Sequence, residues 1–156
     1  LNAVRVGLST YGLYPSKQTG NGLNLKPALS WNTTVIQVKT VPSGSKISYD
    51  CTYTTRRPTK LAILPVGYWD GLDRSLSSKG MVIIGGKICP ILGRICMNLT
   101  MIDVTEVLNV KIGDKATLIG KQKNKSISAE DMAKWADTIN YEIIDRINPL
   151  IPRIVK

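Results

Sequence analysis

Tyr49 is the side chain whose setting best suits proton transfer. It lies in the polar stretch of residues 46–54, predicted as a short strand after the turn at residues 41–45, where a phenol can face a cavity. The chain has no histidine, so proton transfer near neutral pH falls to carboxylates, lysines, cysteines or tyrosines. A free phenol ionises only at about pH 10, so Tyr49 needs cationic neighbours to act as a base. The competing interpretation is a half-buried strand tyrosine.

The cysteines and the charge exclude several other classes of site. Cys51, Cys89 and Cys96 are odd in number and form no C-x-x-C pair, which argues against a disulfide framework and a zinc site, and no other metal site is predicted. A net charge of +10 calls for an anionic partner. The basic residues are scattered and lack interleaved aromatic residues, so solvated surface charge is favoured over nucleic-acid binding.

The N-terminus and the length of the apolar runs indicate the cellular compartment of the protein. No apolar run approaches the roughly twenty residues that span a bilayer, and the N-terminus lacks signal-peptide architecture. With an odd set of unpaired cysteines, these features predict a cytoplasmic protein that does not bind membranes. The start at Leu-Asn-Ala-Val-Arg, without an initiator Met, suggests a piece cut from a longer chain.

The elements that must position Tyr49 are mostly short β-branched segments separated by turn signals. Strands are predicted over residues 4–8, 29–41, 46–54, 60–66, 81–84, 87–92, 95–104, 116–119 and 141–147. Gly85 and Gly86 form a two-residue hairpin turn. One helix is predicted from Ser128, which forms a capping box with Asp131, to about Thr138. This pattern predicts a mainly β domain, barrel-like or sandwich-like, with one helix.

A series of short motifs runs in one order along almost the whole chain. They are Arg5-Val-Gly-Leu8 with Tyr11-Gly12, Leu25-Lys-Pro-Ala-Leu-Ser30, Val41-Pro-Ser-Gly44, Ser48-Tyr49, Leu64-Pro-Val-Gly-Tyr-Trp-Asp-Gly71, Gly93-Arg-Ile-Cys-Met97, Asp103-Val-Thr105 and Ile139-Asn-Tyr-Glu142. Each motif is weak by itself. Together they resemble the C-terminal part of bacterial alanine racemase.

The resemblance implies a domain organisation. The family has an N-terminal (β/α)8 barrel that holds pyridoxal phosphate, followed by a mostly β domain, in a head-to-tail homodimer. Residues 1–14 would then be the last barrel strand, residues 15–28 a linker and residues 29–156 the β domain. A lone barrel strand has unpaired edges, so residues 1–14 are expected to lack their sheet neighbours here.

The resemblance also implies how alanine racemisation, which supplies D-alanine for peptidoglycan, would use these residues. Tyr49, delivered from the partner subunit, would be one of two bases; the other is a barrel lysine that this chain lacks. Arg5 would donate to the pyridine nitrogen of the cofactor. The amides of Gly7 and Leu8, with the phenol of Tyr141, would hold its phosphate.

The substrate-binding residues implied by the resemblance lie later in the chain. The backbone of Met97 would face the substrate carboxylate. Four side chains would line the substrate entrance: Tyr68, Arg74, Arg94 and Ile139. Without the barrel lysine, the isolated chain is expected to be inactive.

Three positions depart from the family pattern. Asp50 stands where the family commonly has Gly, Asn98 where it has Asp, and Asp145 where it has Cys. Asp50 would place negative charge beside the phenol of Tyr49, which disfavours its ionised form. A serine racemase therefore stays open. A pyridoxal-phosphate-dependent decarboxylase of the same architecture is a separate alternative, against which Tyr49 followed by Gly-Tyr-x-Asp-Gly favours the racemase. A non-catalytic nucleic-acid-binding β-barrel and a pure dimerisation module also stay open.

Overall fold

Antiparallel sheets form the body of the protein, which a computed structural model describes over residues 2–16, 18 and 22–155. The largest sheet runs in the order β1 (Trp31–Thr34), β9 (Lys115–Gln122), β6 (Met81–Ile84) and β7 (Lys87–Pro90), with β10 (Lys125–Ile127) also paired to β9. A second sheet has the order β2 (Gln37–Val41), β5 (Thr59–Leu64) and β8 (Thr100–Asp103). A short hairpin pairs β3 (Lys46–Ile47) with β4 (Tyr53–Thr54).

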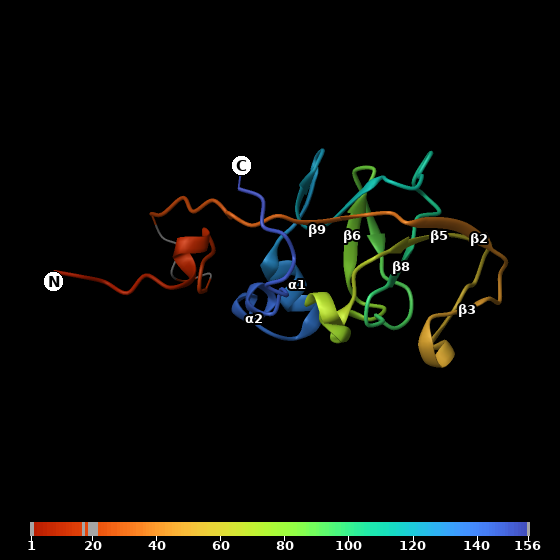
Figure 1. Cartoon of the computed structure of the whole chain (residues 1–156), viewed down its shortest axis with the longest axis horizontal. Coiled ribbons are helices and arrows are strands. Elements are labelled where there is room, and N and C mark those ends of the chain that lie inside the picture. The colour runs from red at the N-terminus through yellow and green to blue at the C-terminus, as the bar shows by residue number, and fades with distance from the viewer. Residues whose placement is uncertain (1, 17, 19–21, 156) are drawn as a thin grey trace.

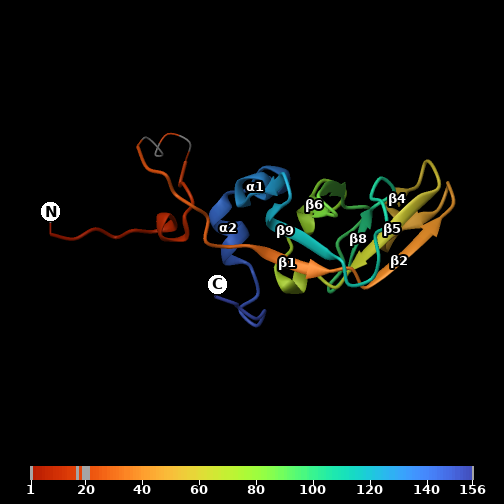
Figure 2. The same cartoon turned by 90° about the horizontal axis from the view of Figure 1, so that it is seen from above.

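The helices gather at one end of this body and the β3–β4 hairpin lies at the other (Figures 1 and 2). Two α-helices follow β10: α1 (Ala129–Ala136) and α2 (Asn140–Asp145). Short 3-10 turns occur at η1 (Leu8–Tyr11), η2 (Tyr49–Cys51), η3 (Tyr68–Asp70) and η4 (Arg74–Leu76). The described strands form open sheets, so the predicted mainly β class is confirmed in its sandwich-like form.

The core lies where β5, β6 and β9 meet α1. Leu64, Ile83, Leu118 and Met132 are among its buried side chains. Three consecutive residues of β6, Val82 to Ile84, are fully buried, which shows that both faces of this strand are covered. Burial on both faces explains why these strands have continuous apolar sequences rather than an alternating pattern.

Several local predictions are confirmed. The strand at residues 81–84 is β6, and the turn that follows has positive φ at both Gly85 (62°) and Gly86 (81°). The helix begins where the capping box predicted: the Ser128 hydroxyl accepts from the Asp131 N–H at 3.1 Å, and the Asp131 carboxylate accepts from the Ser128 N–H at 2.9 Å. Both features depend on neighbouring residues alone, which is why the sequence predicts them.

The strand predicted over residues 29–41 is wrong as a single element. It divides into β1 and β2 at Val35 and Ile36. The Val35 N–H donates to Asp114 O at 2.9 Å, and the Ile36 N–H donates to Ile63 O at 3.0 Å. The chain therefore leaves one sheet and joins the other at this point. The strand predicted over residues 95–104 is likewise shorter, because β8 begins only at Thr100.

Residues 141–147 are not a strand, and the chain therefore has a second helix, α2. The buried residues of this segment, Asn140, Ile143 and Ile147, are spaced by three and four, while Ile139 and Tyr141 are exposed. This spacing belongs to one face of a helix. A short apolar run does not distinguish a helix from a strand without knowing which residues face the core.

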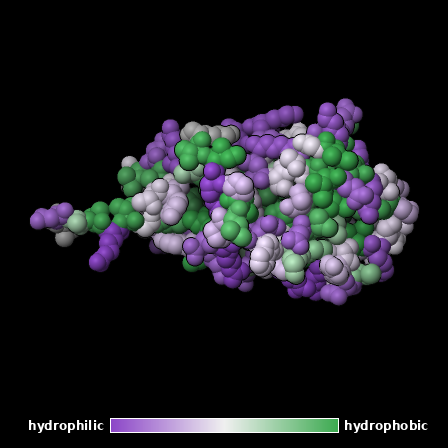
Figure 3. All heavy atoms as spheres, in the orientation of Figure 1, coloured by the Kyte–Doolittle hydropathy of each residue, from purple (hydrophilic) through white to green (hydrophobic). Residues whose placement is uncertain are grey.

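The N-terminal segment also differs from the predicted strand at residues 4–8. Val4 and Val6 are 75% and 55% exposed, and no described residue pairs with them in a sheet. The segment projects from the body with apolar side chains open to solvent (Figures 1 and 3). The expectation that residues 1–14 lack sheet neighbours therefore holds for the described residues 2–14.

Candidate active site

Tyr49 lies at the tip of the β3–β4 hairpin, not in a strand. Residues 49–51 form η2 instead of continuing the strand predicted over residues 46–54. The Tyr49 side chain is 70% exposed, so it is not the half-buried strand tyrosine of the competing interpretation. The β3–β4 hairpin that carries it lies at the end of the molecule away from α1 and α2 (Figures 1 and 2). The phenol of Tyr49 is thus available to another molecule.

The backbone around Tyr49 is strained. Ser48 has φ 65° and ψ −176°, a region that is essentially restricted to glycine. Asp50 and Cys51 also have positive φ, at 60° and 51°. Asp tolerates this left-handed conformation better than most residues. A glycine at position 50, which the resemblance implies as the family's usual residue there, would adopt the same φ without strain.

A loop at residues 93–96 contacts this strained turn directly. The Ser48 hydroxyl donates to Arg94 O at 2.5 Å and lies 3.5 Å from the Cys96 sulfur. A Cβ on Gly93 would lie 2.8 Å from Ile47 O, so only glycine permits this close approach. The Asp50 carboxylate lies 4.0 Å from Arg94 Nε, which partly offsets the negative charge beside the phenol.

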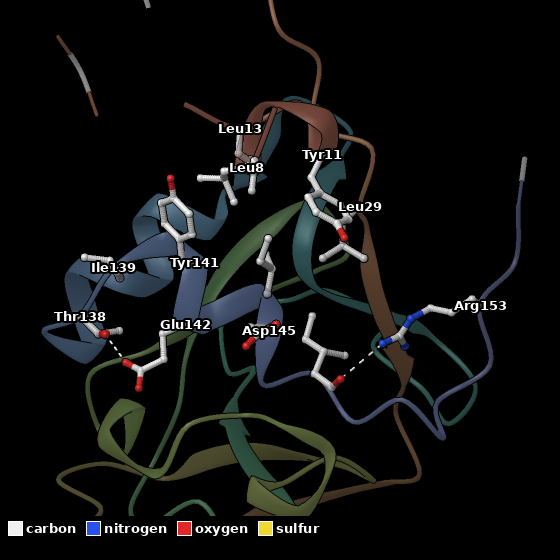
Figure 4. Close-up of a pocket in the computed structure, with 13 residues that line it drawn as sticks. Leu8, Tyr11, Leu13, Leu29, Thr138, Ile139, Tyr141, Glu142, Asp145 and Arg153 are labelled. Atoms are coloured by element: carbon white, nitrogen blue, oxygen red, sulfur yellow. Dashed lines mark hydrogen bonds between the residues drawn. The ribbon is translucent and has the colours of Figure 1, made fainter. Parts of the chain in front are cut away.

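A cavity of about 990 Å³ is lined by residues of η1 and α2 (Figure 4). The α2 helix lies at the end of the body opposite the β3–β4 hairpin (Figures 1 and 2). Four of the predicted residues line the cavity together: Gly7, Leu8, Ile139 and Tyr141. Its volume falls within the range of about 300–1,000 Å³ that is common for small-molecule sites. The structure therefore joins residues more than 130 positions apart in one potential binding site.

The Gly7 end of this cavity has the properties of an anion cradle. No described atom beyond the adjacent residues lies within 4 Å of the position that a Cβ would take on Gly7. The first turn bond of η1 runs from the Thr10 N–H to Gly7 O at 3.0 Å. The N–H groups of Leu8 and Ser9 consequently have no acceptor within the turn. Open space, free amides and the phenol of Tyr141 suit a phosphate group.

Other residues that line the same cavity were not predicted. They are Tyr11, Leu13, Leu29, Thr138, Glu142, Ile144, Asp145, Ile147 and Arg153. Glu142 accepts a short hydrogen bond from the Thr138 hydroxyl and forms an ion pair with Arg146 at 2.6 Å. The i,i+4 spacing of Glu142 and Arg146 would have indicated this pair, had residues 141–147 been recognised as a helix.

A second cavity of about 500 Å³ contains two more predicted residues, Tyr68 and Arg74, with Gly71, Asp73 and Arg146. Burial opposes the ionisation of Asp73, but hydrogen bonds from Ser75 and the charge of Arg146 outweigh it and lower the pKa of Asp73 below its ordinary 3.8. Arg146 forms ion pairs with both Asp73 and Glu142. It therefore connects the loop that carries Arg74 to the helix that carries Tyr141.

We expect Asp73→Asn to remove an acid-sensitive part of the stability. A carboxyl with a lowered folded pKa contributes stability that is complete above its unfolded pKa, about 3.8, and disappears as pH falls through the folded pKa. Because Arg146 is half exposed, the loss in free energy of unfolding should stay within about 1 kcal/mol. Urea unfolding at pH 7, 4 and 2.5 would measure it: the gap between wild type and variant should narrow as the pH falls below 3.8. A gap of the same size at all three pH values would contradict the ion-pair explanation.

Met97 lies beside Tyr68 because the η3 turn packs on its backbone. The Tyr68 N–H donates to Cys96 O and the Trp69 N–H to Met97 O, both at 3.0 Å. A Cβ on Gly67 would lie 2.2 Å from Cys96 O, so glycine is required for this contact. The loop at residues 93–97 thus connects the Tyr49 turn on one side to the Tyr68 turn on the other.

The structure does not bring every predicted residue to a cavity. Arg5 lies on the exposed N-terminal segment, outside the lining of the large cavity. Arg94 contacts the Tyr49 turn rather than the cavity of Tyr68 and Arg74. Of the departures from the family pattern, Asn98 is exposed and Asp145 lines the large cavity.

The cysteines form no disulfide. Cys51 is exposed, whereas Cys89 and Cys96 are buried. Burial raises the pKa of Cys89 to about 11, so its thiol stays protonated and unreactive. Within the described ranges, no three His, Cys, Asp or Glu side chains are grouped as metal ligands. The helices of this same part of the chain are too short or too polar to cross a bilayer.

Comparisons with known proteins agree on one family. The profile of the alanine racemase C-terminal domain matches residues 28–155. An alanine racemase of Halothermothrix orenii is 50% identical over all of this chain and 41% of its own length. One from Leptospira interrogans is 48% identical, over 97% of this chain and 41% of its own length. The chain thus spans about two fifths of the curated relatives that it matches.

Solved structures show the same fold. The alanine racemase of Streptomyces lavendulae, a producer of D-cycloserine, superposes with a TM-score of 0.90 at 41% identity, over 97% of this chain and 40% of that one. The Bacillus anthracis alanine racemase with bound L-Ala-P gives 0.88 at 42% identity, over 94% of this chain and 38% of that one.

Proposed function

The chain belongs to the alanine racemase family, whose C-terminal domain it carries, and from this premise we propose that it serves a pyridoxal-phosphate-dependent isomerase that interconverts L- and D-alanine. The D-alanine would be used for peptidoglycan. In this proposal residues 29–156 are the β domain, residues 15–28 a linker and residues 1–14 the last strand of a (β/α)8 barrel. The unpaired thiols suit a reducing compartment such as the cytoplasm.

One observation carries the proposal: Tyr49 and Tyr141 lie at opposite ends of the same chain, and both are accessible. Tyr49 is 70% exposed on its hairpin, while Tyr141 lines the large cavity beside α2. A single copy therefore does not bring the candidate base to the candidate cofactor site. In a head-to-tail homodimer, the hairpin of one copy would reach the cavity end of the other.

The residues at the cavity fit pyridoxal phosphate. The amides of Gly7 and Leu8, with the phenol of Tyr141, would hold its phosphate, and the open space at Gly7 and the Ser9 N–H, which has no acceptor within the turn, support this placement. Arg5 would reach the pyridine nitrogen once the N-terminal segment is seated in a barrel. When bound, the cofactor accepts the electron pair that the substrate Cα–H bond leaves behind.

Tyr49 of the partner copy would supply one face of the proton transfer. In its ionised form the phenol takes the α-proton of one enantiomer, and in its protonated form it returns a proton to that same face. A barrel lysine would act on the other face. In each turnover the abstracting base would take one proton from the carbon and the other base would give one proton to it. The abstracting base then ends protonated and the donor ends deprotonated, which is the state needed for the reverse direction.

The remaining candidate residues would admit and orient the substrate. The backbone of Met97 would face its carboxylate. Tyr68 and Arg74 share a cavity, and Ile139 is exposed at the edge of the larger one. With Arg94 they would line the entrance, where cationic side chains attract an amino acid's carboxylate. The family match gives no support to a nucleic-acid-binding barrel.

We expect the isolated 156-residue chain to have no racemase activity, because the second base lies outside it. The measurement is conversion of D-alanine, and separately of D-serine, with added pyridoxal phosphate. The complete enzyme containing this chain is the positive control, and its ratio of alanine to serine turnover settles the substrate. Reproducible turnover by pure chain would prove the two-base assignment wrong.

A further inference from the structure

The turn that carries Tyr49 is held in an unfavourable backbone conformation by contacts from outside the hairpin. Ser48, Asp50 and Cys51 all have positive φ, an unfavourable conformation for these residues that persists only where the surroundings impose it. Within the turn itself, the Cys51 N–H makes one long bond to Ser48 O at 3.3 Å. That single bond is too weak to impose three strained residues.

The loop at residues 93–96 supplies the contacts that hold these three residues in their strained conformation. The Ser48 hydroxyl is bound to Arg94 O on one side of Tyr49. On the other side, the Asp50 carboxylate faces Arg94 Nε at 4.0 Å. Within the described part of the chain this Nε is buried and has no hydrogen-bond partner. Asp50 is therefore the nearby anion that offsets its charge.

We propose that the ion pair between Asp50 and Arg94 positions the phenol of Tyr49, so that Arg94 is a positioning residue of the proton transfer as well as a residue of the entrance. This inference rests on the function proposed above. Tyr49 is flanked by Ser48 and Asp50, and both are attached to Arg94, by its carbonyl and by its side chain. Two attachments to one residue leave the turn little freedom to rotate the phenol. Asp50, which departs from the family's glycine, thereby replaces flexibility with an electrostatic contact.

The ion pair is partly exposed, since the Asp50 and Arg94 side chains are 68% and 40% accessible. Its effect is consequently on geometry more than on stability. Displacement of a reacting group by about 1 Å can cost up to a hundredfold in rate. We expect Asp50→Asn in the complete enzyme to lower kcat for the Tyr49-dependent direction about tenfold, with KM unchanged within about twofold.

The kinetic test is a double-mutant cycle. Asp50→Asn and Arg94→Met should each slow Tyr49-dependent α-proton exchange, and the double variant should be no slower than the worse single variant. Exchange on the lysine face should be unaffected. Asp137→Asn is the matched control, because Asp137 has a similar φ of 58° and forms no ion pair with the described residues. If the two substitutions slowed exchange by factors that multiply in the double variant, or if they changed KM alone, the proposal would be overturned.

A second measurement needs no catalysis and uses the chain itself. Cys51 is the exposed cysteine of the three, so a nitroxide label attaches within the Tyr49 turn without further mutation. The label should become more mobile in Asp50→Asn and Arg94→Met, to the same extent, and remain unchanged in Asp137→Asn. Equal mobility in all variants would overturn the positioning role. If the complete enzyme failed to racemise alanine, the proposed function would fall while the label still decided whether the ion pair holds the turn.

Discussion

Replacing Tyr49 with Phe in the complete enzyme is expected to lower alanine racemisation by about 10²- to 10⁴-fold while leaving α-proton exchange of one enantiomer intact. The substitution removes only the phenolic oxygen that would take and return the proton. The lysine on the opposite face would still exchange the proton of its own enantiomer with solvent. The loss should therefore depend on direction, which distinguishes a missing base from general damage.

Exchange of the α-proton in deuterated water, followed separately for L- and D-alanine, makes this measurement. Tyr53→Phe is the matched control, because Tyr53 lies in the same hairpin and packs against the small cluster of Ile47, Leu61 and Leu92. That control should retain its activity in both directions. An equal loss for the two enantiomers in Tyr49→Phe, or no loss, would refute the role assigned to Tyr49.

Replacing Gly71 with Ala is expected to give a large loss of stability, because two backbone segments meet there. A Cβ on Gly71 would lie 2.3 Å from Arg146 O and 2.7 Å from Ile147 Cα. Neither atom belongs to a flexible side chain, so η3 and the end of α2 must separate. Overpacking of this kind costs about 1–3 kcal/mol, in addition to the cost of a positive φ in alanine.

Gly113→Ala is the control that separates the cost of the steric contact at position 71 from the cost of a positive φ in alanine. Gly113 has φ 89°, close to the 98° of Gly71, but nothing lies within 4 Å of its Cβ position. Urea unfolding of both variants should show that Gly71→Ala loses about 1–3 kcal/mol more than Gly113→Ala. Equal losses would mean that the backbone conformation alone, and not the contact with α2, makes glycine necessary at position 71.

Features governed by adjacent residues were predictable from the sequence. The Gly85–Gly86 turn needs positive φ at both positions, and the Ser128–Asp131 box closes within four residues. Neither depends on the rest of the fold. The order of the motifs also predicted the family, which the profile match over residues 28–155 confirms.

Features governed by distant contacts were not predictable in this way. The apolar run at residues 141–147 becomes a helix because Ile143 and Ile147 face the core together. The long strand divides at Val35 because Asp114, almost eighty residues away, offers the next acceptor. In both cases local propensity is nearly neutral, so tertiary burial decides the conformation.

By itself the sequence determined which residues are available for chemistry: a phenol in place of histidine, an arginine and glycine near the start, and a tyrosine near the end. Only the tertiary structure decided where they lie. It separates the β3–β4 hairpin, which carries Tyr49, from α2, which carries Tyr141, and it brings Tyr141 and Gly7 to one cavity from nearly opposite ends of the sequence. The physical reason is that side-chain type is local, whereas position follows from which apolar surfaces are buried against one another.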